Sequence, residues 1–363
     1  MLHILHLISS ERWSGAAVAA AELAAAQRAL GHEIEFACRG GRGLERRIAA
    51  MGLTRASGLK LHRSMLGDMR ELRRRVLAGI DVIHCHLGPD HMLAFAALGK
   101  RGRPGMPLLA RTLHRGLTIA PGPVRRRLLK AAADVYIIPS RADRERAVAA
   151  GIAPEAVACV RGAVDLERFR PGLDGARLRA EWGIEANAPA LGTVSRMRRG
   201  RGQFDLLEAF GEVVKKIPNA RWIVAGSGSE QALFKKRLAG RPEAANIVFI
   251  GHRKDDLPEA YAAMDVCVVP APGSDGSCRA ALEAMACGRP VVAMARGALA
   301  DIVEDGKTGW LAENTTQLAE ALIEALGKKS QAMRTNARQR VESGYTQQHR
   351  AEATIAAYKQ ARR

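Results

Sequence analysis

Aromatic residues are scarce in this chain, at 4% of its 363 residues. The sequence has no aromatic-interleaved RNA-binding motif and no recognition helix, so nucleic acid is disfavoured as a partner. Its six cysteines are scattered without a CxxC spacing, which argues against a zinc site or a disulfide framework and favours a reducing cytoplasm. Charged residues interrupt every apolar run, so no segment is predicted to span a bilayer.

The sequence also lacks the features of a leader peptide and of a metal centre. Residues 1–15 have neither a basic leader nor a long apolar stretch, so they indicate a buried first strand rather than a signal peptide. No DxD sequence and no cluster of histidine and carboxylate residues offers a metal site. We therefore expect a cytoplasmic protein without a metal or another cofactor.

Positive charge is abundant instead. The formal net charge is +19 and the isoelectric point is near 10.4. Residues 39–75 hold eleven Lys and Arg against three acids, and residues 100–130 hold nine against none. Such a field favours a polyanion, which here means a phosphorylated substrate or an anionic inner-membrane surface. The alternative is that the arginines reflect a GC-rich coding bias on solvated helix faces.

Short β-type runs alternate with longer helical patterns along the chain, which is typical of α/β folds with helices on both faces of parallel sheets. The expected strands are residues 2–8, 33–37, 82–86, 108–113, 135–139 and 157–160, then 190–194, 221–225, 247–250, 266–270, 291–294 and 310–311. A Pro/Gly break at 170–172 separates the two sets. The pattern predicts two doubly wound, Rossmann-like domains, residues 1–171 and 172–345, and a last helix, residues 346–363, that packs back on the first domain.

Two strand-to-helix turns contain glycine, at Gly15 in the first half and at Gly226 and Gly228 in the second. Glycine lets the backbone approach a phosphate, and a helix N-terminus offers N–H groups to an anion. Neither turn has the GxGxxG spacing of a dinucleotide fingerprint, so each is also compatible with a simple tight connection.

An arginine-rich loop follows the expected strand 190–194. Its arginines, which alternate with Gly200 and Gly202, are Arg196, Arg198, Arg199 and Arg201. Guanidinium groups bind diphosphate oxygens bidentately, and the carboxyl ends of strands are where open α/β sheets bind ligands. A solvated charged loop is the alternative, but the interleaved glycines and the position favour phosphate binding.

Two acids, Asp275 and Glu283, lie eight positions apart between two strand-like runs. We expect Asp275 at the end of the strand and Glu283 one turn into the following helix, at the mouth of the sheet. Carboxylate oxygens accept strong hydrogen bonds from sugar and ribose hydroxyls. The alternative is a solvated loop acid and a helix-start acid that interacts with the helix dipole. Together with the arginine loop, the pair fits a sugar nucleotide.

The ordered motifs of the chain resemble those of the retaining glycosyltransferases of family 4, which have the GT-B architecture of two Rossmann-like domains facing across a cleft. The resemblance covers nearly the whole chain. The matching segments are GHEI at 31–34, DVIHCH at 81–86, residues 133–140 with VDLERF at 164–169, residues 195–202, VFIGH at 248–252, and residues 275–283 in place of an E-x7-E motif, followed by AMACGRPVVA.

The resemblance implies a role for each matching residue. Glu283 would hold the ribose hydroxyls of the nucleotide, and Asp275 would contact the hydroxyls of the donor sugar. Arg196 and Arg201 would bind the diphosphate, with Arg201 in the place of the family's usual lysine. Gly15 would let the N-terminal loop approach the donor phosphate.

Three further segments are implied in the donor site. His114 matches a histidine near the transferred sugar, although a hydrogen-bonded histidine at a strand end is the alternative. His252 and Arg253 lie where the base is held, mainly by backbone. Asp275 is one methylene shorter than the usual glutamate, and the residues after it depart from the usual GFGLP-like turn, which makes this segment the expected determinant of donor choice. The departing residues are Gly276, Ser277, Cys278 and Arg279.

The sequence therefore predicts a metal-independent, retaining hexosyltransferase. Its donor would be a nucleotide-diphosphate sugar, specifically a UDP-sugar. Its acceptor would be a glycan or glycolipid of the cell envelope, specifically a hydroxyl of the lipopolysaccharide core, and the basic N-terminal domain would dock on the inner membrane. Two alternatives remain open: a GT-B sugar-nucleotide epimerase, which needs no acceptor, and a non-catalytic basic protein that binds glycan or nucleic acid.

Overall fold

The computed structural model describes residues 1–11, 13–39, 44–61, 65–99, 105–114, 132–271, 275–327 and 331–362. The chain forms two compact units, which we call unit 1 (Met1–Arg161 with Gln347–Arg363) and unit 2 (Gly162–Thr346). The predicted boundary at residue 171 is thus too late. Val164 donates its N–H to the carbonyl of Tyr345, and Phe169 is buried in the unit 2 core, so these residues already belong to unit 2.

Unit 1 is built on a seven-stranded parallel sheet with the order β3-β2-β1-β4-β5-β6-β7. The strands are β1 (His3–Ile8), β2 (Glu33–Cys38), β3 (Thr54–Arg55), β4 (Val82–Cys85), β5 (Leu108–Thr112), β6 (Val135–Ile138) and β7 (Val157–Cys159). Because β2 and β3 lie on one side of β1 and β4 to β7 on the other, the winding reverses between β1 and β4. Such switch points form ligand sites in open α/β sheets.

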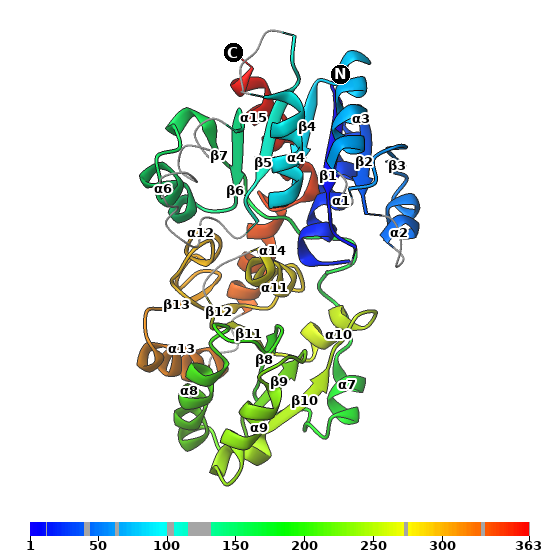
Figure 1. Ribbon diagram of the computed structural model, residues 1–363. Helices are drawn as coiled ribbons and strands as arrows, with labels where there is room; N and C mark the ends of the chain where they lie inside the picture. The colour runs from blue at the N-terminus through cyan, green and yellow to red at the C-terminus, as the bar shows by residue number, and fades with distance from the viewer. Residues whose placement is uncertain are drawn as a thin grey trace. The chain divides into compact units, whose positions relative to one another are not determined.

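The described helices of unit 1 cover both faces of this sheet (Figure 1). They are α1 (Gly15–Ala29), α2 (Leu44–Ala50), α3 (Met65–Leu77), α4 (Gly88–Leu98), α6 (Arg141–Ala149) and α15 (Gln347–Ala361). The short alanines of α1 let α15 pack closely against it, and Arg350 of α15 donates to the carbonyl of Ala19 at 3.0 Å. The last helix therefore completes unit 1 although it follows unit 2 in the chain.

Unit 2 has a six-stranded parallel sheet with the order β10-β9-β8-β11-β12-β13. Its strands are β8 (Ala190–Val194), β9 (Arg221–Ala225), β10 (Ile247–Gly251), β11 (Val266–Val269), β12 (Val291–Met294) and β13 (Gly309–Ala312). Its helices are α7 (Ala176–Glu181), α8 (Gln203–Lys216), α9 (Gln231–Leu238), α10 (Leu257–Ala262), α11 (Asp275–Ala286), α12 (Leu299–Ile302), α13 (Thr315–Gly327) and α14 (Gln331–Glu342). The switch point lies between β8 and β11.

The predicted fold class is confirmed, since both units are Rossmann-like and doubly wound. The apolar strands of unit 2 carry two cores, one on each face of the sheet, as parallel strands buried on both sides require. Among the described helices, none is both long and apolar enough to cross a bilayer.

Candidate functional site

The arginine loop of unit 2 is held against the loop that follows β9. Ser195 donates its N–H to the carbonyl of Ala225 at 3.0 Å, and Met197 donates to the carbonyl of Ser227 at 3.2 Å. The side chain of Met197 is buried in the core and anchors the loop. Arg196, Arg198 and Arg199 are exposed and Arg201 is half-buried, so the loop presents its guanidinium groups beside the switch point.

Close packing of these two loops gives Gly226 and Gly228 a structural role. A Cβ atom on Gly226 would lie 2.1 Å from the carbonyl oxygen of Ser195, and one on Gly228 would lie 2.1 Å from that of Met197. Gly226 also has a φ of +121°, which side chains rarely adopt. The two glycines are thus needed to seat the arginine loop, whereas their contact with a phosphate stays a prediction.

A buried contact that sequence reasoning missed holds Glu283. This side chain lies on α11 and is 7% exposed. Tyr261 of α10 is fully buried and donates its hydroxyl to Glu283 Oε2 at 2.9 Å. Burial, and then the carboxylate of Glu283, raise the pKa of Tyr261 well above its ordinary value, so the tyrosine stays a donor. The sequence gives no sign of this bond, because its two partners lie 22 residues apart on different helices.

The position of Asp275 differs from expectation. We expected it in the loop at the end of a strand, with Glu283 one turn into the helix, but α11 begins at Asp275 itself. Eight residues of helix correspond to roughly 12 Å of rise, so Asp275 and Glu283 lie more than two turns apart along one helix. The side chains of Asp275 and Ser277 lie outside what the structure describes, and the predicted contacts of residues 275–277 with the donor sugar stay predictions.

The two departing residues that follow are described. Cys278 is buried in the core of unit 2, so its thiol packs against apolar side chains. Arg279 is half-buried. Any contact of Cys278 with a donor must therefore come from its backbone.

His252 and Arg253 follow β10 at the same edge of the sheet. His252 is exposed. The guanidinium of Arg253 forms a two-pronged pair with Asp256 and lies over the ring of Trp182, 5.6 Å from its centroid. Because these partners engage its side chain, the prediction of a base held here depends on the backbone of this turn.

Two predicted site residues lie at the same edge of the unit 1 sheet. Gly15 is the first residue of α1, and Ser14 caps that helix by accepting the N–H of Ala17 at 3.3 Å. No described atom lies within 4 Å of a Cβ atom built on Gly15, so packing among the described residues does not explain this glycine. His114 follows β5, is 9% exposed, and has its Nε2 atom 3.3 Å from Nδ1 of His86.

Contrary to the expectation from sequence, unit 1 does contain a histidine cluster that has the geometry of a possible metal site, formed by His6, His84 and His86. All three are buried at the β1–β4 switch point. Each described ring nitrogen already has a hydrogen-bond partner in the protein, so a metal ion would have to displace these bonds. Burial lowers the pKa of His6 to about 4 and lowers the pKa values of His84 and His86 well below the ordinary value, so the cluster is neutral at pH 7.

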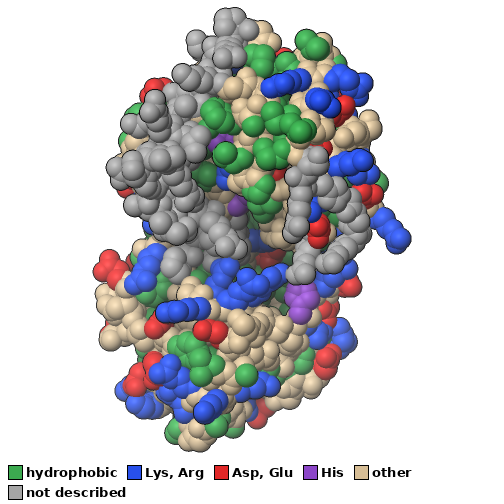
Figure 2. Space-filling model, viewed as in Figure 1, with side chains coloured by type: hydrophobic (Ala, Val, Ile, Leu, Met, Phe, Trp, Pro, Cys, Tyr) green, Lys and Arg blue, Asp and Glu red, His purple; other side chains and the backbone are tan. Residues whose placement is uncertain are grey.

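The positive charge of the chain is concentrated in unit 1. By sequence, unit 1 has 30 Lys and Arg against 14 Asp and Glu, a net charge of +16, while unit 2 has 26 against 23, a net charge of +3. Figure 2 shows Lys and Arg side chains on the visible face of each unit, with acidic side chains among them. The sequence expectation of a basic N-terminal half therefore holds for the folded unit.

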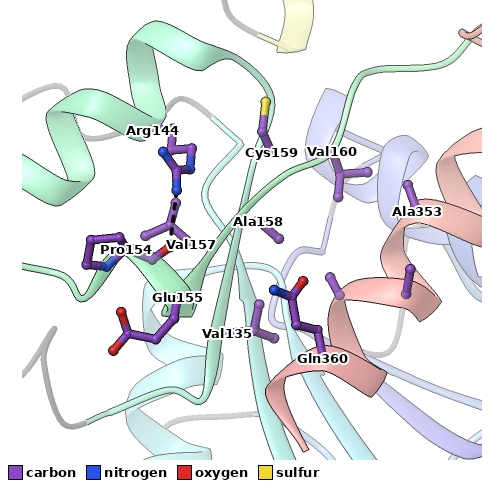
Figure 3. A pocket seen from close by; sticks show the side chains of 12 residues that line it. Val135, Arg144, Pro154, Glu155, Val157, Ala158, Cys159, Val160, Ala353 and Gln360 are labelled. Carbon is purple, nitrogen blue, oxygen red and sulfur yellow. Dashed lines mark hydrogen bonds between the residues drawn. The ribbon is translucent and has the colours of Figure 1, made fainter. Parts of the chain in front are cut away.

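A cavity of about 620 Å³ lies elsewhere in unit 1, beside the edge strand β7 (Figure 3). Alanines of α15 form one wall, and Arg144 and Glu155 supply its charged groups. Arg144, which lines this cavity, donates a hydrogen bond to the carbonyl of Pro154 at 3.4 Å. Its described lining contains none of the predicted site residues.

Comparison with known proteins gives the chain its family. A model described as Glycosyltransferase Family 4 matches residues 13–168, and one described as Glycosyl transferases group 1 matches residues 188–328. The D-inositol 3-phosphate glycosyltransferase of Saccharomonospora viridis is 33% identical over 267 residues, which are 67% of this chain and 61% of that protein. The GDP-mannose-dependent alpha-(1-6)-phosphatidylinositol monomannoside mannosyltransferase of Mycolicibacterium smegmatis is 32% identical over 203 residues, 54% of this chain and 52% of that protein.

The matches span about half the length of these curated relatives. Among solved structures, the Anabaena protein Alr3699/HepE in complex with UDP and glucose superposes with a TM-score of 0.82 at 20% identity, covering 99% of this chain and 100% of that one. The two family models match most of each Rossmann-like unit, and the fold of HepE is shared over 99% of this chain. This chain belongs to the GT-B glycosyltransferase family.

Proposed function

We propose that this protein is a metal-independent, retaining glycosyltransferase that uses a UDP-sugar as donor. The observation that supports this most is the pairing of the arginine loop and Glu283 at the two sides of the unit 2 switch point. Guanidinium groups suit a diphosphate, and a carboxylate held by Tyr261 suits the two hydroxyls of a ribose. The HepE protein, which shares the fold, was crystallised with UDP and glucose.

In the proposed reaction, the bond between the anomeric carbon and the β-phosphate oxygen breaks while the acceptor oxygen attacks from the same face. The acceptor's proton passes to the departing phosphate oxygen, so nucleotide diphosphate and the glycoside form with configuration retained. Arg196 and Arg201 would stabilise the negative charge that develops on the diphosphate. The protein would otherwise contribute by holding donor and acceptor in place.

The proposed acceptor is a hydroxyl on an anionic, phosphorylated or lipid-linked glycan. The net charge of +16 on unit 1 supports this, since the field favours anionic partners. The lipopolysaccharide core and phosphorylated inositol lipids both have this chemistry, and relatives are named for inositol 3-phosphate and phosphatidylinositol monomannoside acceptors. A panel of both acceptor types, with release of nucleotide diphosphate as the readout, separates the two.

The donor site can be tested by calorimetric titration with UDP. We expect Glu283→Gln and Arg196→Ala each to weaken UDP binding by at least tenfold, which corresponds to about 1.4 kcal/mol. The matched controls are Glu320→Gln and Lys216→Ala, which change exposed residues of α13 and α8 in the same unit. Unchanged UDP affinity in both site variants would contradict the proposed donor site.

Two further assays address the reaction type and the membrane. A transferase releases nucleotide diphosphate only when acceptor is present, whereas acceptor-independent turnover would indicate an epimerase. Retention is read from the anomeric configuration of the product by NMR.

The docking of unit 1 on anionic lipid is tested with vesicles. If unit 1 docks on anionic lipid, rising salt concentration should weaken vesicle binding far more than it weakens UDP binding. Absent or salt-insensitive vesicle binding would refute the docking.

A further inference from the structure

Asp90 lies where β1 and β4 end, at the switch point of unit 1. The two strands stay paired up to Leu7, whose carbonyl accepts the N–H of His86 at 3.0 Å. Beyond this pair the chain leaves in two directions, because α1 packs on one face of the sheet and α4 packs on the other. The backbone N–H groups that follow the two strands therefore need another acceptor.

One carboxylate accepts an N–H group from each of the two diverging segments. Oδ1 of Asp90 accepts the N–H of Ser9, after β1, at 2.8 Å, and Oδ2 accepts the N–H of Leu87, after β4, at 2.8 Å. The hydroxyl of Ser9 donates to the same carboxylate. Asp90 is the third residue of α4 and is 1% exposed, so water does not compete for these charge-assisted hydrogen bonds.

The carboxylate of Asp90 is ionised at neutral pH. Burial raises the pKa of Asp90 to about 6, and the hydrogen bonds from Ser9 and Leu87 partly offset the effect of burial. Above this pH both oxygens can only accept hydrogen bonds, which matches the two N–H donors. An asparagine of the same shape has one accepting oxygen and one donating nitrogen, so it could satisfy only one of the two N–H groups.

The segment that Asp90 anchors leads to Gly15. Residues 9–14 connect β1 to α1, and the described members of this segment are half-buried. Nearer α1, the ring of Trp13 packs against the unit 1 core, and the guanidinium of Arg47 lies over this ring, 5.2 Å from its centroid. Asp90 holds the other end of the segment from a buried position.

We propose that Asp90 is a positioning residue, which ties the segment 9–14 to the start of α4 so that the backbone at Gly15 stays aligned with the donor diphosphate. The inference rests on the proposed function and on the predicted contact of Gly15 with the donor phosphate. Asp90 touches no substrate in this role and acts through the backbone of the segment. A displacement of about 1 Å in such a segment can lower a rate by about a hundredfold.

The first test measures the two hydrogen bonds and needs no substrate. Amide protons that donate to a buried carboxylate resonate downfield and exchange slowly, so NMR of ¹⁵N-labelled protein should show both features for Ser9 and Leu87. In Asp90→Asn, one or both of these amide protons should move upfield and exchange about tenfold faster or more. Unchanged signals of both amides in this variant would overturn the proposal.

The second test compares Asp90→Asn with a matched control, Asp143→Asn. Asp143 is 3% exposed at the start of α6, where it accepts the hydroxyl of Ser140 and pairs with Arg146. Both variants therefore lose a buried carboxylate at a helix start, and both should lower the melting temperature. We expect Asp90→Asn alone to lower kcat, by about ten- to a hundredfold, while its UDP affinity, which unit 2 supplies in the proposed function, stays within about twofold of wild type. Equal kcat losses in the two variants, or an unchanged kcat in Asp90→Asn, would overturn the proposal.

Ser9→Ala makes a milder change in the same contact, because it removes the hydroxyl bond to Asp90 and keeps the backbone bond. It should lower kcat about threefold with little change in melting temperature. An unchanged kcat in Ser9→Ala would overturn the proposal, including where Asp90→Asn does not fold. A wild-type protein with the expected amide signals but no transferase activity would refute the proposed function and not the two hydrogen bonds.

Discussion

Acid should unfold unit 1 of this protein at a pH where unit 2 is still stable. Four histidines of unit 1 are buried as neutral bases: burial lowers the pKa values of His6 and His91 to about 4, and it lowers those of His84 and His86 well below the ordinary value. Their pKa in the unfolded chain is about 6.5. The stabilisation is therefore complete above about pH 6.5 and is lost as the pH falls towards 4.

The magnitude follows from proton uptake. At pH 5 each histidine that stays neutral in the fold lowers the free energy of unfolding by about 2 kcal/mol, because only the unfolded chain binds its proton. Four such groups lower it by about 8 kcal/mol. Asp90 acts in the opposite direction: its burial raises its pKa to about 6, so the folded state takes up a proton first and recovers about 1 kcal/mol. The net loss of about 7 kcal/mol compares with a typical total stability of 5–15 kcal/mol.

The assay is urea unfolding at pH 7.5, 6 and 5 with tryptophan fluorescence. Trp13 reports on unit 1, and Trp182, Trp222 and Trp310 report on unit 2, whose single histidine, His252, is exposed. A Trp13→Phe variant removes the unit 1 signal and so identifies the acid-sensitive transition.

The control variants separate burial from histidine content. His84→Gln cannot take up a proton, so it should reduce the loss between pH 7.5 and 5 by about 2 kcal/mol. His349→Gln, which changes an exposed histidine of the same unit, should leave the loss unchanged. A pH-independent stability of unit 1 in this range, or a full loss in His84→Gln, would refute the reasoning.

Two other predictions concern unit 2. Tyr261→Phe removes the hydrogen bond to the Glu283 carboxylate, so UDP binding should weaken about tenfold. The control Tyr345→Phe removes a hydrogen bond to the carbonyl of Asp301 and should leave UDP binding unchanged. Equal effects of the two variants on UDP binding would argue against a special role for Tyr261. Gly226→Ala should lower stability by about 1–3 kcal/mol and weaken UDP binding, because its Cβ would displace the arginine loop. Gly327→Ala, where a Cβ meets no atom of the described residues within 4 Å, should be neutral in melting experiments, and a fully stable Gly226→Ala would contradict the packing.

The fold could be predicted from the sequence because most of its strands are short, largely apolar runs separated by helical patterns. The expected strand 190–194 matches β8, and the expected strand 221–225 matches β9. The start of α11 could not be placed, because Asp275 to Arg279 contains glycine and serine, which are common in turns as well as in first helical turns. The predicted domain boundary lies at a Pro/Gly break, whereas the chain changes unit between Arg161 and Gly162, where a single glycine is a weaker break than a Pro/Gly pair.

The sequence also predicts only part of the candidate site. The arginine loop and Glu283 are candidates from the sequence because their residue types suggest phosphate and hydroxyl binding, and their roles in binding stay predictions. Tyr261 is not, because its partner is 22 residues away on another helix. The spacing of His84 and His86 places them on one face of a strand, but their contact with His6 depends on the pairing of β1 with β4, which the sequence does not state.

The most direct test of the account is sugar transfer by the purified protein. The experiment incubates a UDP-sugar with and without a phosphorylated glycan acceptor and follows UDP release and the glycoside product by NMR, with Glu283→Gln beside the wild type and Glu320→Gln as control. We predict acceptor-dependent UDP release and a product of retained configuration, both reduced at least tenfold in Glu283→Gln alone. UDP-sugar turnover that needs no acceptor, or transfer that is unaffected by Glu283→Gln, would contradict the account.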